Sequence, residues 1–292
     1  MLRTLVLALA LAAAPGHVLA QQKLRIVTTS ADLKSLAEVV GGARVEVESL
    51  AAPEQDPHAI ELKPAQLARA RSAALLIRVG LDHEPWLAKL QLPESVVVVD
   101  ASRGVRLIQT QTPRLRVERR AHVHAFGNTH YWLDPANAVP ITAAIRDALA
   151  KLSPQDAKFF DTNRTAFIDA LTKKIEDWKK VLAPFRGAKI VVVHDSWSYF
   201  AEHFGLQIVA AAEPHPGVPP SPAELAALFQ RMRESGVKIL IADPHSNPSL
   251  VRQIVTKGGA HVVTLSPSGH DYIHLFDDNV TRLVESLKRA GP

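Results

Sequence analysis

Two blocks of short apolar strands, each strand followed by a segment of helical periodicity, constrain the fold of this chain most strongly. The expected strands lie at residues 23–29, 44–50, 74–79, 95–100, 189–193, 206–211, 237–242 and 261–265. Strands that alternate with helices are typical of βαβ units, which build parallel sheets. We therefore expect an α/β protein with two lobes, each a mostly parallel four-stranded sheet with flanking helices.

One long amphipathic helix separates the two blocks. It is expected to begin at Ser153-Pro154 and to continue to about Leu182. Its large apolar residues fall on one face, at Phe160, Phe167, Leu171, Ile175, Trp178 and Leu182. A helix of roughly 28 residues is about 40 Å long, which is more than one small domain needs. We therefore divide the chain into an N-terminal lobe (residues 21–152), a linking helix (153–184) and a C-terminal lobe (185–292).

Residues 1–20 have the features of a secretory signal peptide. Arg3 supplies the positive start, residues 5–14 form an apolar core, and Val18-Leu19-Ala20 is a small-residue cleavage site. The mature chain is then expected to begin near Gln21 and to be exported. Because the signal lacks a lipobox cysteine, we expect a free periplasmic protein rather than a lipid-anchored one.

The absence of cysteine from the sequence limits the chemistry of an exported protein. Without disulfides or thiolates, any metal would be bound by His, Asp, Glu or water. The formal net charge is only +5, and no basic run is interleaved with aromatic residues. Nucleic acid is therefore not an expected partner.

Three histidines occupy predicted loops that a two-lobed fold could bring together. His58 and His194 each lie at the carboxyl end of a predicted strand, the edge at which open α/β sheets bind ligands. His130 lies in the polar turn of residues 127–135. Neutral imidazole suits zinc, and three histidines with a fourth ligand or water form a tetrahedral site. The pattern alone leaves a metal site and ordinary polar loop residues both open.

Sequence motifs of enzymes are absent. His194-Asp195-Ser196 contains the residue types of a nucleophilic triad, but consecutive residues leaving a strand point in different directions. The sequence contains no HExxH, GxSxG, GxxxxGK or GxGxxG motif. We therefore expect a binding protein and not an enzyme. The competing hypotheses are a periplasmic zinc hydrolase, in which an open metal position would activate water, and a surface adhesin or metal-storage protein.

Several short motifs extend over nearly the whole mature chain. They are Asp56-Pro57-His58, Gly80-Leu81-x-x-Glu84-Pro85-Trp86-Leu87, Gly127-Asn128-Thr129-His130-Tyr131-Trp132-Leu133-Asp134-Pro135, His194-Asp195, Tyr199-Phe200, Phe204-Gly205-Leu206 and Glu213-Pro214-His215-Pro216-Gly217. Together they resemble the metal-specific solute-binding proteins of bacterial ABC importers, especially the zinc-binding branch. The resemblance implies two lobes joined by one backbone helix, one metal ion in the cleft, and handover of the ion to a membrane permease. It also implies that His58, His130 and His194 are the histidine ligands.

The resemblance leaves the fourth ligand and the ion open. Many manganese members and some zinc members have an aspartate just after the last strand, where this chain has Ser266. Water, Asp271 or His245 could take that place, although Asp271 is expected to cap a helix. Three neutral imidazoles without an assured carboxylate favour zinc, with manganese as the second choice and a manganese-specific member as the alternative.

A second departure lies before His130. Many zinc members carry a long loop rich in histidine and acidic residues there, whereas this chain has an arginine-containing stretch that ends in His122-Val123-His124. We expect that stretch to add little to metal capture. Glu213 and Asp243 are candidates for orienting the imidazoles. The remaining histidines are expected to be surface or structural residues, namely His83, His203, His215, His261, His270 and His274, and the protein is expected to be a monomer.

Overall fold

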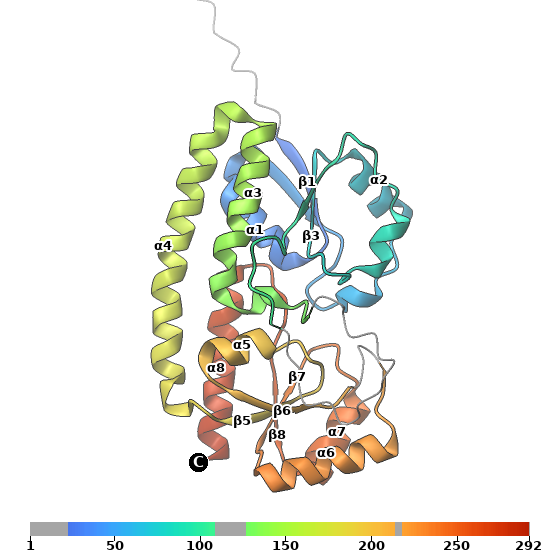
Figure 1. The fold of residues 1–292 in the computed structure, drawn as a ribbon, viewed down its shortest axis with the longest axis vertical. Coiled ribbons are helices and arrows are strands. Elements are labelled where there is room, and N and C mark those ends of the chain that lie inside the picture. Colours follow the sequence, from blue (N-terminus) through green and yellow to red (C-terminus); the bar gives the residue numbers. More distant parts are fainter. Residues whose placement is uncertain (1–22, 109–126, 214–217, 292) are drawn as a thin grey trace, which may run out of the picture.

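The computed structural model describes residues 23–108, 127–213 and 218–291. Within this part of the chain, two four-stranded parallel sheets form two lobes, which lie one above the other in Figure 1. The predicted α/β fold with two parallel sheets is confirmed. The predicted signal peptide, the His122-Val123-His124 motif and His215 lie outside the described residues.

The first lobe contains a sheet of strand order β2-β1-β3-β4, and all neighbouring strands are parallel. The strands are β1 (Leu24–Thr28), β2 (Val45–Ser49), β3 (Leu75–Arg78) and β4 (Val97–Asp100). Its helices are α1 (Ala31–Gly41), α2 (Pro64–Ser72) and α3 (Ala138–Leu152). The central strands β1 and β3 have buried apolar residues at Ile26, Val27, Leu75, Leu76 and Ile77, as is typical of a parallel sheet that is covered on both faces.

The second lobe repeats this arrangement with the strand order β6-β5-β7-β8. The strands are β5 (Lys189–Val192), β6 (Gln207–Ala211), β7 (Ile239–Ala242) and β8 (His261–Thr264). Its helices are α5 (Ser198–Phe204), α6 (Pro222–Ser235), α7 (Pro248–Gly258) and α8 (Tyr272–Ala290). In each lobe the first strand in sequence lies between the second and the third. The loops that follow the strands therefore gather at one edge of each sheet.

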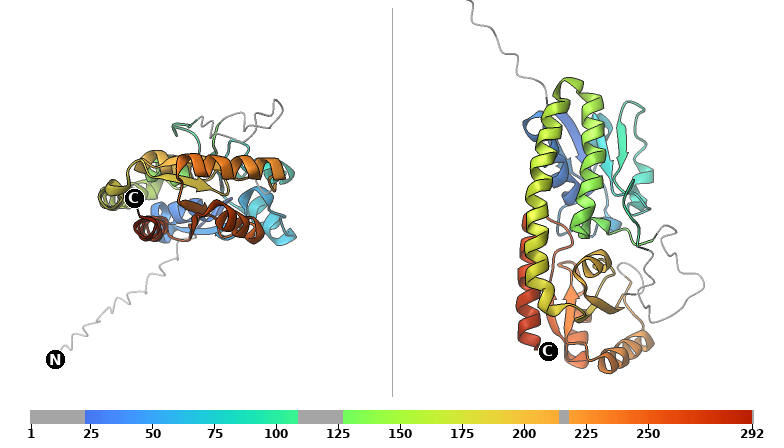
Figure 2. Two further views of the ribbon diagram at one scale, coloured as in Figure 1. Left: turned by 90° about the horizontal axis from the view of Figure 1, so that it is seen from below. Right: turned by 60° about the vertical axis from the view of Figure 1, so that its left-hand side comes forward.

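Helix α4 (Ala157–Leu182) connects the lobes and runs along one side of both, as Figures 1 and 2 show. A 3₁₀ turn at Pro154–Asp156 precedes it, so the α-helix begins slightly later than predicted. The predicted apolar face is buried at Phe160, Phe167, Leu171, Trp178 and Leu182. Helix α4 packs on α1 and α3 of the first lobe and on α8 of the second. Because one apolar core continues through both lobes along these helices, they form a single packed unit.

The C-terminal helix α8 lies beside α4 and reaches the first lobe. Trp178 on α4 stacks on Phe276 of α8 with ring centroids 5.2 Å apart, and the indole N–H of Trp178 donates to Asp277 Oδ1 at 2.8 Å. Lys174 adds an ion pair to the same carboxylate at 2.7 Å. In the described residues, no helix is both long enough and apolar enough to cross a membrane.

The loop between β8 and α8 (residues 265–271) contacts the first lobe through several hydrogen bonds. The indole of Trp132 donates to the carbonyl of Pro267 at 2.8 Å. Asp32 on α1 is buried and accepts from Ser268 Oγ at 2.6 Å and from the Gly269 amide at 3.2 Å. The Tyr272 amide donates to Ser35 Oγ at 3.0 Å. These bonds hold the two lobes together.

The buried carboxyl of Asp32 is expected to make stability depend on pH. Burial raises its pKa from 3.8 to about 7, against the opposing effect of the hydrogen bonds from Ser268 and Gly269. Between roughly pH 4 and pH 7 the folded protein therefore binds a proton that the unfolded chain has lost, so this group lowers stability as the pH rises through that window. We expect Asp32→Asn to stabilise the metal-free protein at pH 8 by up to about 4 kcal/mol and to have little effect at pH 4.

Thermal unfolding of the metal-free protein at pH 4 and pH 8 measures this difference. The amide of an asparagine can donate to Ser268 Oγ and accept from the Gly269 amide, so both contacts are kept. Ser35→Ala is the control, because it removes a neighbouring hydrogen bond between the lobes without an ionisable group and should act equally at both pH values. An Asp32→Asn variant whose stability differs from that of the wild type by the same amount at both pH values would show that folding does not raise the pKa of Asp32.

Candidate metal centre

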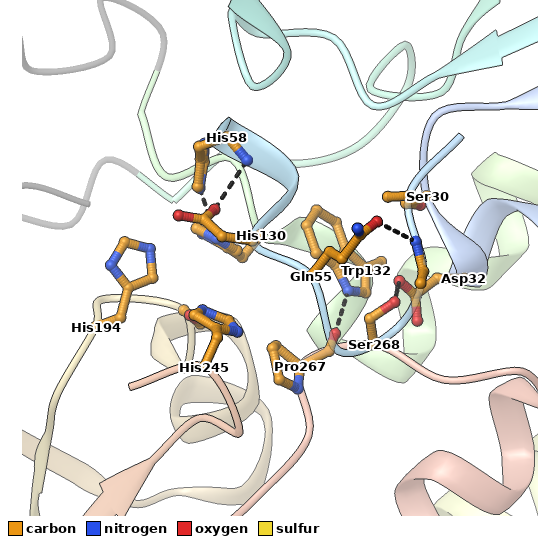
Figure 3. Close-up of a pocket in the computed structure, with 14 residues that line it drawn as sticks. Ser30, Asp32, Gln55, His58, His130, Trp132, His194, His245, Pro267 and Ser268 are labelled. Atoms are coloured by element: carbon orange, nitrogen blue, oxygen red, sulfur yellow. Dashed lines mark hydrogen bonds between the residues drawn. The ribbon is translucent and has the colours of Figure 1, made fainter. Parts of the chain in front are cut away.

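His58, His130 and His194 converge between the two lobes (Figure 3). One ring nitrogen of each histidine forms a set in which all atoms lie within 4.8 Å of one another. The Nε2 atoms of His58 and His130 are 3.3 Å apart. Two nitrogens bound tetrahedrally to one zinc at about 2.0–2.1 Å are separated by roughly 3.3 Å. The spacing of this pair thus already fits a shared zinc ion, and His194 needs only a small further approach.

Each histidine is placed by the local structure around it. His58 lies in the 3₁₀ turn Pro57–Ala59, and Asp56 caps this turn by accepting from the His58 amide at 2.9 Å. His130 immediately precedes the turn Tyr131–Leu133. His194 follows directly after β5 and a short apolar extension of that strand. His58 and His194 therefore both lie beyond the carboxyl ends of parallel strands, the edge at which open α/β sheets bind ligands.

The Nδ1 atoms of all three rings face hydrogen-bond acceptors. His58 Nδ1 lies 3.1 Å from the carbonyl oxygen of His83, and His130 Nδ1 lies 3.2 Å from Asn128 Oδ1. His194 Nδ1 lies 3.5 Å from Glu213 Oε2. Since carbonyl, amide and carboxylate oxygens accept, each Nδ1 carries the proton and each Nε2 presents a lone pair. Neutral imidazoles in this tautomer are suited to binding a cation.

His194 provides the sharpest test of whether a cation fits this place. Its Nε2 atom is buried and has no hydrogen-bond partner among the described residues. A buried polar atom without a partner is costly, and a metal ion would supply the missing interaction. Burial lowers the pKa of His194, but the hydrogen bond to Glu213 and nearby negative charges outweigh it, so the pKa lies above the usual 6.5. The same negative surroundings favour a bound cation.

The cavity that the three histidines line is small. Its volume is about 20 Å³, which is enough for one particle the size of a water molecule. His245 lines the same cavity, with Nε2 4.0 Å from Asp243 Oδ2. Asp271 does not line it, since its side chain caps α8 by accepting from the His274 amide at 2.8 Å. Of the two protein side chains considered as a fourth ligand, the structure brings only His245 to the cavity.

Ser266 also does not line this cavity. Its backbone amide donates to Asn279 Oδ1 at 2.9 Å, and its carbonyl accepts from Asn279 Nδ2 at 2.8 Å. These bonds hold the backbone in place shortly after the end of β8. The next two residues, Pro267 and Ser268, line the cavity. Ser266 therefore contributes no ligand to the cavity.

His83 is a residue of this site that sequence reasoning grouped only with surface or structural positions. It is fully buried, its ring centroid lies 4.2 Å from that of His58, and its Nδ1 is 2.8 Å from Thr129 Oγ1. Its carbonyl is the acceptor for His58. His83 thus connects the loop of His58 with the turn of His130. The only sequence signal for it was its place within the Gly80 to Leu87 motif.

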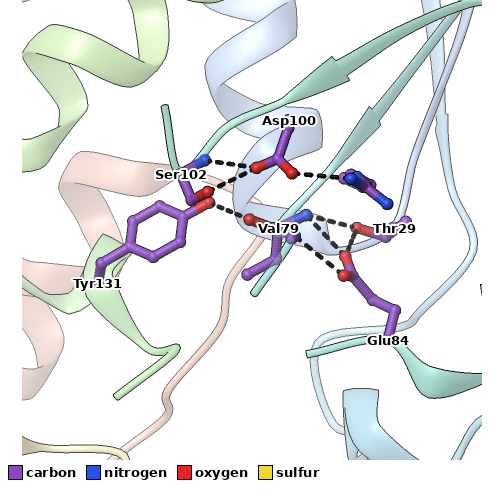
Figure 4. A network of polar contacts seen from close by, with 8 residues as sticks. Thr29, Val79, Glu84, Asp100, Ser102 and Tyr131 are labelled. Carbon is purple, nitrogen blue, oxygen red and sulfur yellow. Dashed lines mark hydrogen bonds and ion pairs between the residues drawn. The ribbon is translucent and has the colours of Figure 1, made fainter. Parts of the chain in front are cut away.

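Buried Glu84 closes the turn that positions His83 (Figure 4). Its carboxylate accepts from the amides of Val79 and Gly80 at 2.6 and 3.0 Å and from the hydroxyl of Thr29. Leu81 and Asp82 in this turn have φ values of 56° and 57°, a conformation that few non-glycine residues adopt. Burial raises the pKa of Glu84, partly offset by these hydrogen bonds. The carboxylate therefore stabilises an otherwise unfavourable turn beside the histidines.

The fold and the histidine cluster define a class of protein, the solute-binding proteins in which a long helix joins two α/β lobes. The chain belongs to the ZnuA family, described as "Zinc-uptake complex component A periplasmic", whose family model matches residues 26–286. This membership confirms the predicted resemblance to the zinc-type solute-binding proteins of ABC importers.

Individual relatives agree with this assignment. The "High-affinity zinc uptake system protein ZnuA" of Yersinia pestis is 27% identical over 266 residues, which cover 84% of this chain and 83% of that protein. The "Zinc-binding lipoprotein AdcA" of Streptococcus pneumoniae is 25% identical over 98% of this chain, but the match spans only 60% of AdcA. A crystal structure of ZnuA superposes with a TM-score of 0.80 at 25% identity, covering 91% of this chain and 99% of that one.

Proposed function

We propose that this protein is a periplasmic, high-affinity zinc-binding protein that delivers the ion to the permease of an ABC importer. The observation that carries the proposal is the convergence of three imidazoles whose Nδ1 atoms all face acceptors, which directs the Nε2 lone pairs to a common point. In this proposal His58, His130 and His194 are the ligands, and water or His245 completes the shell. The names of the ZnuA and AdcA relatives support zinc as the ion.

Zinc is preferred to manganese on the chemistry of the donors. Manganese favours carboxylate and carbonyl oxygens, whereas imidazole nitrogen favours zinc and other late first-row ions. The three histidines supply only nitrogen, and their cavity lacks Asp271 and Ser266 among its lining residues. A manganese-specific member of the same family is the alternative. It would require oxygen ligands such as the carboxylates of Asp32 or Asp56, which also line the cavity but accept hydrogen bonds from Ser268 and from the His58 amide.

The proposal is capture and release of an ion, without catalysis. A zinc hydrolase requires a substrate pocket beside the open metal position and a general base. The cavity has space for about one particle the size of a water molecule, which supports a single ion as the cargo. The family is one of solute-binding proteins. Hydrolysis of activated esters or phosphate esters by the zinc-loaded protein, abolished by His58→Ala, would favour the hydrolase.

The route to the periplasm and the assembly state are also parts of the proposal. Export through residues 1–20, the division into lobes at 21–152, 153–184 and 185–292, and a monomeric state remain predictions. The mass of the protein secreted from a bacterial host would give the cleavage site, with a start near Gln21 as the expected result. Light scattering of the same material would give the assembly state.

Titration of the metal-free mature protein with zinc, in competition with a chelator of known affinity, tests the proposed function. We expect one zinc ion per chain with a Kd of about 10 nM or tighter. Manganese should bind at least about 100-fold more weakly. Tighter binding of manganese would support the alternative ion, and absence of zinc binding would contradict the proposal.

A further inference from the structure

Asn128 contacts two of the three histidine segments through opposite ends of one amide group. Its Oδ1 accepts from the backbone amide of His130 at 2.9 Å and lies 3.2 Å from Nδ1 of the same residue. Its Nδ2 donates to the carbonyl oxygen of Asp195 at 2.8 Å. Since Asp195 directly follows His194, one side chain joins the turn of His130 to the end of strand β5.

The orientation of this amide is determined by its partners. A flipped amide would place NH₂ against the backbone N–H of His130 and its oxygen against the carbonyl of Asp195, so both of these contacts would become repulsive. The main chain of Asn128 is fixed as well, because its amide donates to the Ile108 carbonyl at 3.1 Å and its carbonyl accepts from Tyr199 Oη at 3.1 Å. The position of the Asn128 side chain is therefore fixed by the hydrogen bonds of its own main chain.

We propose that Asn128 is a positioning residue that holds His130 and His194 at the separation that one zinc ion requires. It keeps the proton of His130 on Nδ1 and fixes the strand end that carries His194, and it does not touch the ion. This inference rests on the proposed zinc-binding function. Asn128 is not proposed to position His58, because His58 is hydrogen-bonded to Asp56 and to the carbonyl of His83.

The affinity test compares Asn128 with Asn137, a second asparagine close to the turn that follows His130. Asn128→Ala should weaken zinc binding about 10- to 100-fold, the usual loss when the partner of a metal ligand is removed. Asn137→Ala is the matched control: its Nδ2 donates to the carbonyl of Tyr131 at 2.8 Å, and its hydrogen bonds involve none of the three histidines. We expect the control to change the Kd by less than about threefold. Equal losses in both variants, or no loss for Asn128→Ala, would overturn the proposal.

A double-mutant cycle separates positioning from general stabilisation of the fold. If Asn128 acts through His130, the effect of Asn128→Ala on the Kd should shrink in a His130→Ala background and persist in a His58→Ala background. A residue that only stabilises the fold would have the same effect in both backgrounds. That outcome would contradict the assignment.

The tautomer of His130 gives a readout that does not depend on metal. Ring ¹⁵N shifts of the metal-free protein should show the Nδ1-protonated form in the wild type and a mixture of tautomers in Asn128→Ala. An unchanged ring in the variant would overturn the proposed role. If the wild type failed to bind zinc, the proposed function would fail, whereas this measurement would still decide whether Asn128 orients His130.

Discussion

Replacing any one of His58, His130 or His194 with alanine is expected to weaken zinc binding by about 1,000-fold. Each substitution removes a direct ligand, so the loss should exceed the 10- to 100-fold effect of removing a ligand's hydrogen-bond partner. Competition titration with a chelator measures the Kd of each variant. The zinc affinity of the three variants should fall by similar factors, because the three imidazoles converge on one point.

His274 supplies the matched control for these substitutions. Its side chain is 72% exposed on α8 and pairs only weakly with Asp278 at 3.5 Å. We expect His274→Ala to retain the wild-type Kd. Zinc at a thousandfold excess over the Kd should also add about 4 kcal/mol to the free energy of unfolding of the wild type and of the control, and so raise their Tm. The three ligand variants should show a far smaller rise in Tm. A ligand variant with wild-type affinity would remove that histidine from the site.

Zinc affinity is expected to fall about 100- to 1,000-fold between pH 7 and pH 5.5. Each imidazole must be neutral to bind the ion, so protons compete at all three positions once the pH falls below the pKa values of the histidines. Burial lowers the pKa of His194, but the hydrogen bond with Glu213 and the charges of Asp243, Glu213 and Asp195 together outweigh it, so this pKa lies above its usual value. As the pH is lowered, protons should therefore begin to compete with zinc for His194 at a higher pH than they would for a free histidine.

Glu213→Gln tests the source of this pH dependence. The amide keeps an acceptor near His194 Nδ1 but removes the negative charge, so the pKa of His194 should fall. Calorimetric titrations at pH 8, 7, 6 and 5 should then show the loss of affinity beginning at a lower pH in the variant than in the wild type. An affinity that stays constant from pH 8 to pH 5 in the wild type would contradict binding by neutral histidines.

The fold could be predicted from the sequence because its signals are local. Apolar strands of four or five residues, each followed by a helical segment, define two parallel sheets, and the buried face of α4 follows from its periodicity. The position of α8 was not predictable in the same way. Its apolar stripe, which includes Leu275, Phe276 and Leu283, shows that one face is buried but does not indicate α4 and the first lobe as its neighbours.

The site was predictable to a smaller extent. His58, His130 and His194 could be singled out as candidates by their places in predicted loops, whereas their proposed role as ligands depended on the resemblance to a known family. The groups that orient the rings depend on tertiary contacts and have weak local signals. The carbonyl of His83 reaches His58 through a turn in which Leu81 and Asp82 adopt a left-handed conformation that their residue types do not indicate.

Asn128 and Asp32 illustrate the same limit. Both are polar residues in positions that are compatible with an ordinary turn and an ordinary helix start. Their roles appear only when the second lobe supplies the carbonyl of Asp195 and the hydroxyl of Ser268. Contacts between segments that are distant in the sequence leave no periodic pattern. The sequence therefore singled out the proposed ligands and Glu213 beside His194, but not His83 or Asn128.

Zinc K-edge X-ray absorption of the mature protein loaded with one equivalent of zinc tests the proposed site most directly. The account predicts three imidazole nitrogens at about 2.0–2.1 Å with one further nitrogen or oxygen ligand. It also predicts the loss of one imidazole from the spectrum of each of the variants His58→Ala, His130→Ala and His194→Ala. A wild-type spectrum with fewer than three imidazoles, or one dominated by six oxygen ligands, would contradict it.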